Sequence, residues 1–349
     1  MYFMGIANSV ELHHAPAEDD DMKCLPQLIG LVYLSVFGCK NIGDDGLGHI
    51  SRMRTVSYLD IGRTGVTDEG LAHLKHLPLL THLQLYDTAI TNAGMKHIGS
   101  LSNLTQLGLS GTLIDCEGLT SILTLHKLQS LSLDGTGIRG AGIGQLKALN
   151  RLGALSLDRT RTTDSALRKL AELEDLMCLE LASTEVTDQG LEHLSQLRNL
   201  TLLVLDDTTI GDAGLQHLSE LRNLKTLSLA GTRITNAGIR ALCRLTELRE
   251  LCLDRTQVTD DCLEHVSGLR NLYKLEVYET QVTLEGAQEL VRRIELIGIC
   301  GGPSYDEQWY VDRHRTVDER HSNYESVSAG CKMHQVHEEQ CLVYSTRIG

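Results

Sequence analysis

The sequence predicts an α/β solenoid, in which one small unit of a strand and a helix is stacked on copies of itself. The phrase Leu-x-x-Leu-x-Leu-x-x-Thr returns every 24 residues through three quarters of the chain. A fixed period of this length is typical of a repeat array, because one unit alone cannot bury its apolar side. Inside each unit, alternating leucines indicate a short strand, and two leucines three residues apart indicate a short helix behind it.

The predicted array covers residues 28–292 in eleven units, the first with 25 residues and the other ten with 24 each. Positions seven and nine of a unit, such as Leu227 and Leu229, are expected to point into the core from a half-buried strand. A threonine at position twelve can bond a neighbouring backbone group and fix the end of the strand. This column consists of Thr64, Thr88, Thr112, Thr136, Thr160, Thr184, Thr208, Thr232, Thr256 and Thr280, with Cys39 in the first unit.

Position sixteen is expected to cap the helical half of the unit, because Asp and Asn side chains accept bonds from free helical N–H groups. The residues there are Asp68, Asn92, Asp164, Asp188, Asp212, Asn236 and Asp260, with Cys116, Gly140 and Leu284 as exceptions. Glycine at position eighteen and leucine at nineteen and twenty-two follow, as in Gly190, Leu191 and Leu194. That spacing places both leucines on one face of a short helix.

These motifs closely resemble the leucine-rich repeat family, over about the middle three quarters of the chain. The second half of the unit, Thr-Asp-x-Gly-Leu-x-x-Leu, is similar to the ribonuclease-inhibitor-like and cysteine-containing branches. Members usually carry Asn or Cys where this chain has threonine. The resemblance implies a curved horseshoe, with a parallel β-sheet on the concave face and short helices on the convex face.

Composition excludes several classes of partner. The formal net charge of −14 disfavours nucleic acid and anionic membranes. No apolar run is long enough for a membrane span, and residues 1–21 lack the pattern of a secretion signal. We therefore expect a monomer in the cytoplasm or nucleus. The ten cysteines do not occur in paired spacings, which favours reduced thiols.

The ends of the chain depart from the period. Residues 1–27 are expected to form a partial cap over the first repeat, and residues 293–303 a closing segment that Gly301, Gly302 and Pro303 interrupt. Residues 304–349 mix charged residues, Tyr and His, with few large aliphatic ones, which predicts an irregular or disordered tail.

No sequence motif predicts an enzyme or a cofactor, because phosphate-binding, metalloprotease and serine-hydrolase motifs are missing. Six histidines recur in the helical half, once per unit, which is typical of a repeat-determined surface rather than a metal site: His49, His73, His97, His193, His217 and His265. The tail carries Cys331, His334, His337 and Cys341, a weak candidate for zinc because the two histidines are close together.

The strand side chains that point away from the core are the remaining candidates. Aromatic side chains cluster in the first three strands: Tyr33, Phe37, Tyr58, His82 and Tyr86. An interrupted column of acids follows at position ten: Asp134, Asp158, Asp206 and Asp254. Aromatic anchors beside a charged strip are typical of a protein-binding hot spot. The acids have a second interpretation, in which Asp at position ten bonds nearby backbone and belongs to the repeat itself.

The sequence therefore predicts a non-enzymatic protein–protein interaction scaffold, whose partner binds the concave face and carries a basic patch. The alternative is a substrate-recognition subunit of a ubiquitin ligase that lacks a recognisable F-box. An enzyme that uses the Cys and His residues of the tail is a third hypothesis with little support.

Overall fold

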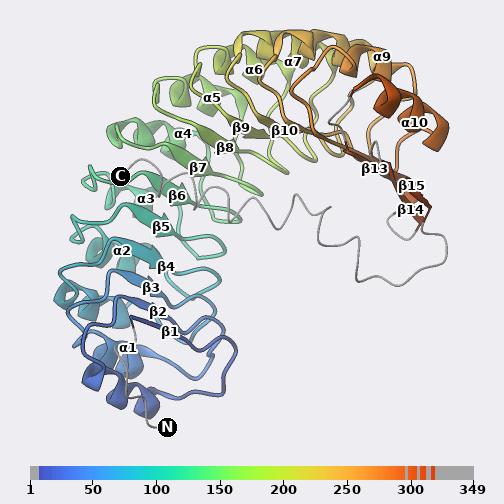
Figure 1. Ribbon diagram of the computed structural model, residues 1–349. Coiled ribbons are helices and arrows are strands. Elements are labelled where there is room, and N and C mark those ends of the chain that lie inside the picture. Colours follow the sequence, from blue (N-terminus) through green and yellow to red (C-terminus); the bar gives the residue numbers. More distant parts are fainter. Residues whose placement is uncertain (1–7, 295–297, 305–306, 312–315, 319–349) are drawn as a thin grey trace. The chain divides into compact units, whose positions relative to one another are not determined.

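The computed structural model describes residues 8–294, 298–304, 307–311 and 316–318. The chain divides into two compact units, residues 1–161 and 162–349. Both are α/β solenoids, with short strands in one layer and short helices in the other (Figure 1).

In the first unit the strands follow one another in chain order and pair in parallel. They are β1 (Ser9–Glu11), β2 (Tyr33–Ser35), β3 (Tyr58–Asp60), β4 (His82–Gln84), β5 (Gln106–Gly108), β6 (Ser130–Ser132) and β7 (Ala154–Ser156). The helical segments are η1 (Asp19–Gln27), α1 (Asp44–Ile50), η2 (Gly70–His76), α2 (Asn92–Ile98), α3 (Cys116–Thr120), α4 (Gly140–Ile143) and η3 (Gly144–Ala148). The strand register equals the sequence period, so residues at the same repeat position lie side by side.

In the second unit the parallel strands are β8 (Cys178–Glu180), β9 (Leu202–Val204), β10 (Thr226–Ser228), β11 (Glu250–Cys252), β12 (Lys274–Tyr278) and β13 (Gly298–Ser304). Two antiparallel strands, β14 (Glu307–Val311) and β15 (Thr316–Asp318), extend this sheet. The helical segments are α5 (Asp164–Leu170), α6 (Asp188–Leu194), α7 (Asp212–Leu215), η4 (Gln216–Glu220), α8 (Asn236–Ile239), η5 (Arg240–Arg244), α9 (Cys262–Val266) and α10 (Leu284–Arg293).

The end of the array differs from the expectation at two places. Gly301, Gly302 and Pro303 do not interrupt the closing segment but belong to β13. The pairing of β13 with β14 shifts between Gly301 and Ser304, which accommodates Pro303, because proline in a sheet is confined to edges and bulges. The prediction of an irregular tail from residue 304 is wrong for β14 and β15, since the backbone groups of β13 offer a pairing edge.

The core is built from the leucine positions of the repeat. Leu227 and Leu229 are fully buried, as the predicted strand alternation requires. The threonines at position twelve donate their hydroxyls to the carbonyl three residues earlier, at 2.5–2.7 Å in all ten regular units. The predicted role of this column is confirmed. Cys39 in the first unit instead donates its thiol to the Leu12 carbonyl at 2.7 Å, which ties the N-terminal segment to the array.

The prediction that the acids at position sixteen cap their own helices is wrong, because they bond to the next repeat instead. Asp164 is the first residue of α5, and its carboxylate accepts the backbone N–H and the hydroxyl of Thr187, at 2.8 and 2.7 Å. Thr187 is the residue that caps α6, by accepting the N–H of Gln189. The same arrangement joins Asp68 to Thr91, Asp212 to Thr235 and Asp260 to Thr283. Each acid therefore holds the helix cap of the next repeat.

Position eleven adopts left-handed backbone in every unit from Gly38 to Glu279, with φ between 51° and 76°. Glycine occupies this position at Gly38, Gly111, Gly135 and Gly231, and side chains occupy it elsewhere. The turn at the end of each strand therefore has the same left-handed backbone geometry in every one of these units. Glycine tolerates this geometry best, but only some of the units have glycine there.

Candidate functional site

The strand face of the first unit carries a ladder of rings. We use "strand face" for the side chains at positions six, eight and ten, which point away from the helices. Tyr33, Tyr58 and His82 are paired across β2, β3 and β4. The two tyrosine rings stack with centroids 4.2 Å apart and planes 14° apart, and the histidine ring follows at 5.7 Å and 31°. All three side chains are half-buried, so part of each ring remains accessible.

Burial changes the titration of this ladder. It raises the pKa of the Tyr58 phenol well above its usual range and lowers the pKa of the His82 imidazole. Desolvation disfavours the charged form in both cases. The Nδ1 atom of His82 lies 2.8 Å from the Thr81 hydroxyl. At neutral pH the ladder is therefore an uncharged aromatic surface.

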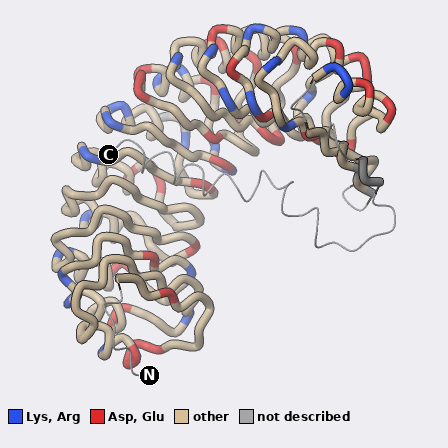
Figure 2. The backbone as a smooth tube through the Cα atoms, viewed as in Figure 1, with Lys and Arg blue, Asp and Glu red and all other residues tan. Residues whose placement is uncertain are grey.

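Beside the ladder runs a second row at position eight, formed by Ser35, Asp60 and Gln84. The Asp60 carboxylate accepts the Ser35 hydroxyl and the Gly62 N–H, each at 3.0 Å. Burial nevertheless raises the pKa of Asp60 above its usual range. Asp60 is the one Asp, Glu, Lys or Arg within strands β2–β7, which are otherwise tan in Figure 2.

Gln84 is the second unusual group of this row. Its side chain is 4 % exposed, and its Oε1 atom is buried without a hydrogen bond to any described residue. The side chain extends over Gly108 on β5, where an added Cβ atom would overlap both Gln84 Oε1 and the Tyr86 ring. The absence of a side chain at Gly108 therefore leaves the space that these two groups fill.

The other two predicted aromatic residues have different surroundings. The Phe37 ring packs edge-on against His14 with centroids 5.3 Å apart, and the Arg63 guanidinium lies 5.4 Å from its centre. Arg63 also pairs with Asp87 at 2.8 Å. Phe37 is thus partly covered by the chain itself and, like the ladder rings, half-buried, whereas Tyr86 lies over Gly108 near Gln84. The structure brings three of the five predicted rings into one ladder.

The acids at position ten bond to the backbone of the next repeat. Asp134 accepts the N–H of Asp158 at 3.0 Å. Asp206 likewise accepts the N–H of Ala230 at 2.9 Å, and Asp254 accepts that of Tyr278 at 2.8 Å. The interpretation of Asp as a residue of the repeat itself therefore accounts for these contacts.

The prediction of an accessible acidic strip is wrong for Asp206 and Asp254. Both are buried in the second unit, with 2 % and 7 % exposed. Their carboxylates are held by the sheet rather than presented on its surface. Asp134 and Asp158 are half-buried in the first unit. Asp134 also accepts the hydroxyls of Ser110 and Ser132, at 2.9 and 3.0 Å.

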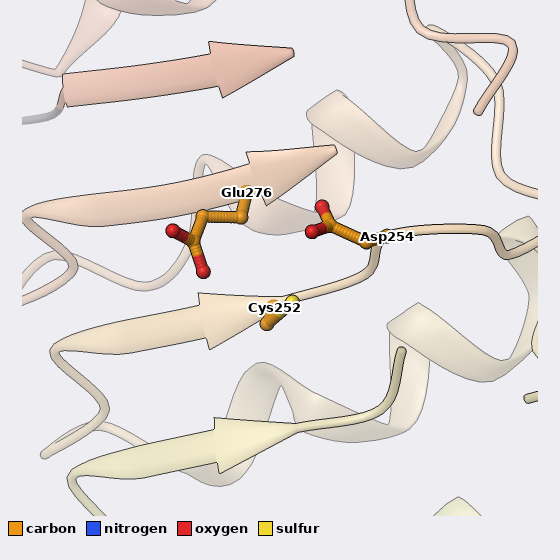
Figure 3. A group of neighbouring side chains, drawn as sticks. All are labelled: Cys252, Asp254 and Glu276. Carbon is orange, nitrogen blue, oxygen red and sulfur yellow. The ribbon is translucent and has the colours of Figure 1, made fainter. Parts of the chain in front are cut away.

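One group in the second unit has the composition of a metal site. The ligand atoms of Cys252, Asp254 and Glu276 lie within 4.8 Å of one another, on β11, the turn after it and β12 (Figure 3). However, burial and the neighbouring acids raise the pKa of the Cys252 thiol, and the Lys274 ammonium lies 3.1 Å from Glu276. Metals bind the thiolate, so an ion would have to displace both a proton and an ammonium group. The contacts present describe a thiol whose pKa is raised beside a Glu276 carboxyl that is paired with an ammonium group.

The remaining candidates are on the helical side or outside the described residues. His49 and His73 line an open depression of about 1060 Å³ together with Asp20, Lys23 and Arg52, among others. Asp20 and Lys23 pair with each other at 2.6 Å, so the charges there are mixed and partly neutralised. Cys331, His334, His337 and Cys341 lie outside the described residues, and their proposed zinc site stays a prediction. No described helix is both long and apolar enough to cross a membrane.

Asp60 and Gln84 were not among the residues predicted from the sequence, which pointed to positions six and ten. The signal was present at position eight, where serine is common in the first unit and Asp60 stands out as charged. That Gln84 lacks a partner could not be read from the sequence, because it depends on how the side chain lies over Gly108.

Together the fold and this surface define a class of protein, a parallel-stranded solenoid that displays variable side chains on its strand face. The family model described as "Leucine-rich repeat region" matches residues 89–278, and one described as "Leucine Rich repeat" matches residues 52–75. The first match covers more than half of the chain, so the chain belongs to the leucine-rich repeat family. The more detailed assignment to the ribonuclease-inhibitor-like branch stays a prediction.

Solved structures agree with this fold. An internalin (inlF) from Listeria monocytogenes is similar with a TM-score of 0.58 and 24 % identity, over 76 % of this chain and 80 % of that one. A leucine-rich repeat protein from Leptospira interrogans is similar with a TM-score of 0.54 and 18 % identity, over 79 % of this chain and 80 % of that one. A comparison with curated protein sequences finds no significant match. At these identities the structural likeness describes the fold alone.

Proposed function

We propose that the protein is a non-enzymatic interaction scaffold that binds a protein partner on the strand face of residues 1–161. The observation that carries the proposal is the half-buried ladder of Tyr33, Tyr58 and His82 beside the Asp60 carboxylate. Rigid aromatic side chains lose little conformational entropy on binding and are enriched in binding hot spots. Leucine-rich repeat proteins are typically scaffolds rather than enzymes, which agrees with the lack of catalytic motifs in the sequence.

The partner is expected to present a basic patch with an apolar centre. The ladder is uncharged, and the one Asp, Glu, Lys or Arg residue within strands β2–β7 is Asp60. We further propose that the protein acts as a monomer in the cytoplasm. Seven of the eight described cysteines are free thiols, which supports a reducing compartment, whereas the eighth, Cys300, is disulfide-bonded: the free ones are Cys24, Cys39, Cys116, Cys178, Cys243, Cys252 and Cys262. Size-exclusion chromatography with light scattering tests the monomer.

The test of this function is affinity purification from the protein's own organism with the full chain as bait. The double variant Tyr33→Ala/Tyr58→Ala removes the stacked pair and should lose the captured partner. A matched control, His97→Ala/His193→Ala, removes two rings from the helical side and should keep it. Thermal unfolding of each variant shows whether the fold is intact. Capture that survives loss of the ladder in a folded variant would place the partner elsewhere.

The alternative, a substrate-recognition role in a ubiquitin ligase, is not proposed, because no contact among the described residues favours it. Co-purification of a ligase scaffold in the same experiment would support it.

A further inference from the structure

We infer that the strand face of β3–β5 receives an arginine side chain of the partner, with its guanidinium between Asp60 and Gln84 and beside the ring ladder. This inference rests on the proposed function and names the chemistry that the partner brings to that site.

The row at position eight offers two acceptor groups, the Asp60 carboxylate and the Gln84 amide oxygen. Asp60 and Gln84 are register partners on β3 and β4, and adjacent strands lie about 4.8 Å apart. The Asp60 carboxylate has two donors, one hydroxyl and one backbone N–H, and neither carries a charge. Gln84 offers an amide oxygen that no described residue bonds. A ligand rich in N–H donors therefore fits both groups at once.

Charge favours a cation at this place. Strands β2–β7 contain no Lys or Arg beside Asp60. The basic residue closest along the chain, Arg63, already pairs with Asp87 and covers Phe37. Burial raises the pKa of Asp60 although the nearby His13 imidazole, which contacts the Ser35 hydroxyl at 3.0 Å, counteracts this shift. A cation from a partner would supply the missing compensation.

The ladder favours arginine over lysine. A guanidinium is planar, carries five N–H donors in a fixed arrangement and stacks on aromatic faces, whereas an ammonium is a compact and strongly hydrated charge. The chain itself shows this contact, because the Arg63 guanidinium lies over the Phe37 ring. Tyr58 and Asp60 are two residues apart on β3, so their side chains lie on the same face of that strand. Gln84 Oε1 and the Tyr86 ring both lie over Gly108, so a guanidinium reaches this buried oxygen only when the Tyr86 ring moves aside.

The experiment measures binding of two fluorescein-labelled peptides, hexa-arginine and hexalysine, to the full-length protein by fluorescence anisotropy. The two probes have equal charge, so general attraction to the acidic protein affects both alike. At about 0.15 M salt, where long-range attraction is screened, we expect hexa-arginine to bind about tenfold more tightly. Equal affinities for the two peptides would overturn the inference.

Variants locate the binding. Asp60→Asn should weaken hexa-arginine binding about tenfold, while Glu185→Gln, which removes the same charge from an exposed site, should change it less than about twofold. Gln84→Leu keeps a side chain of similar size over Gly108 but removes the amide oxygen, and it should reduce the preference for arginine over lysine. Circular dichroism identifies any variant that fails to fold. If Asp60→Asn and Glu185→Gln have the same effect, attraction is non-specific and the inference fails.

The result also separates this inference from the proposed function. If the Tyr33→Ala/Tyr58→Ala variant loses its partner while the peptides bind equally, the scaffold function holds and the arginine inference is wrong. If the wild-type protein prefers hexa-arginine through Asp60 but the ladder variant keeps its partner, the site takes arginine and the proposed partner surface is wrong.

Discussion

Gly190 lies in α6 against the Asp164 carboxylate of the preceding repeat. The variant Gly190→Ala tests whether this close contact is the reason that glycine is needed at this position. An added Cβ atom would overlap Asp164 Oδ1 and lie 3.0 Å from Asp164 Cγ and 3.1 Å from Leu167 Cδ1. To make room, the Asp164 carboxylate must move away from Thr187, whose N–H and hydroxyl it accepts.

The expected magnitude follows from two opposing effects. Overpacking and the loss of these bonds cost about 3 kcal/mol together. Alanine in place of a helical glycine stabilises by about 1 kcal/mol. Gly190→Ala should therefore lower the free energy of unfolding by about 2 kcal/mol. Gly48→Ala is the matched control in α1, because its Cβ atom would meet only His73, at an ordinary 3.4 Å, and it should be neutral or stabilising.

Urea unfolding followed by circular dichroism measures these differences as shifts of the midpoint at constant slope. The deciding measurement is a double-mutant cycle with Asp164→Ala, which removes both the clash and the bonds. In that background Gly190→Ala should no longer destabilise. Equal destabilisation in both backgrounds would refute the explanation, as would equal effects of Gly190→Ala and Gly48→Ala.

Four further predictions follow from single contacts. Thr232→Val removes a buried hydroxyl that donates to a strand carbonyl and should cost about 1–2 kcal/mol in urea unfolding, whereas Thr232→Ser should retain most of the stability. Ser183→Gly should stabilise by about 1 kcal/mol, because Ser183 has a φ of 55°; an unchanged midpoint contradicts this reasoning. Asp206→Asn keeps an acceptor for the next repeat and should cost less than Asp206→Ala; equal losses would show that charge, not the bond, matters. Burial lowers the pKa of His82 in the folded state, so the unfolded chain binds its proton first, and stability should fall as the pH decreases below about 6.5; His82→Gln should flatten this dependence.

The sequence predicted those features that one repeat unit determines by itself. The leucines at positions seven and nine and the hydroxyl of Thr232 act within their own strand and turn, so the period was sufficient to place them. The roles of Asp164 and Asp206 were harder to predict because each acts on the next repeat. The backbone N–H that each carboxylate accepts lies 23 or 24 residues further along the sequence, in the adjacent repeat. Capping propensity alone could not reveal that partner.

The candidate site was predicted only in part, because some of its features depend on contacts between neighbouring repeats. The aromatic ladder was predicted because Tyr33, Tyr58 and His82 differ from the small residues common at position six, and their stacking follows directly from the register. Asp60 and Gln84 were missed although they lie in the neighbouring row of the same strands. The importance of Gln84 depends on Gly108, one repeat further on, and such a relation appears only when side chains are placed.

These two observations lead to a way of separating structural from functional residues in a repeat array. A polar residue that recurs at one position bonds the backbone, as Thr232 does within its own unit and Asp206 does to the next repeat. Asp60 interrupts its column and accepts only the Ser35 hydroxyl and a backbone N–H of its own unit, that of Gly62. Its burial raises the pKa of its carboxyl, which is a cost that the fold does not require. This cost is the reason that Asp60 is proposed here as a partner-binding residue rather than a structural one.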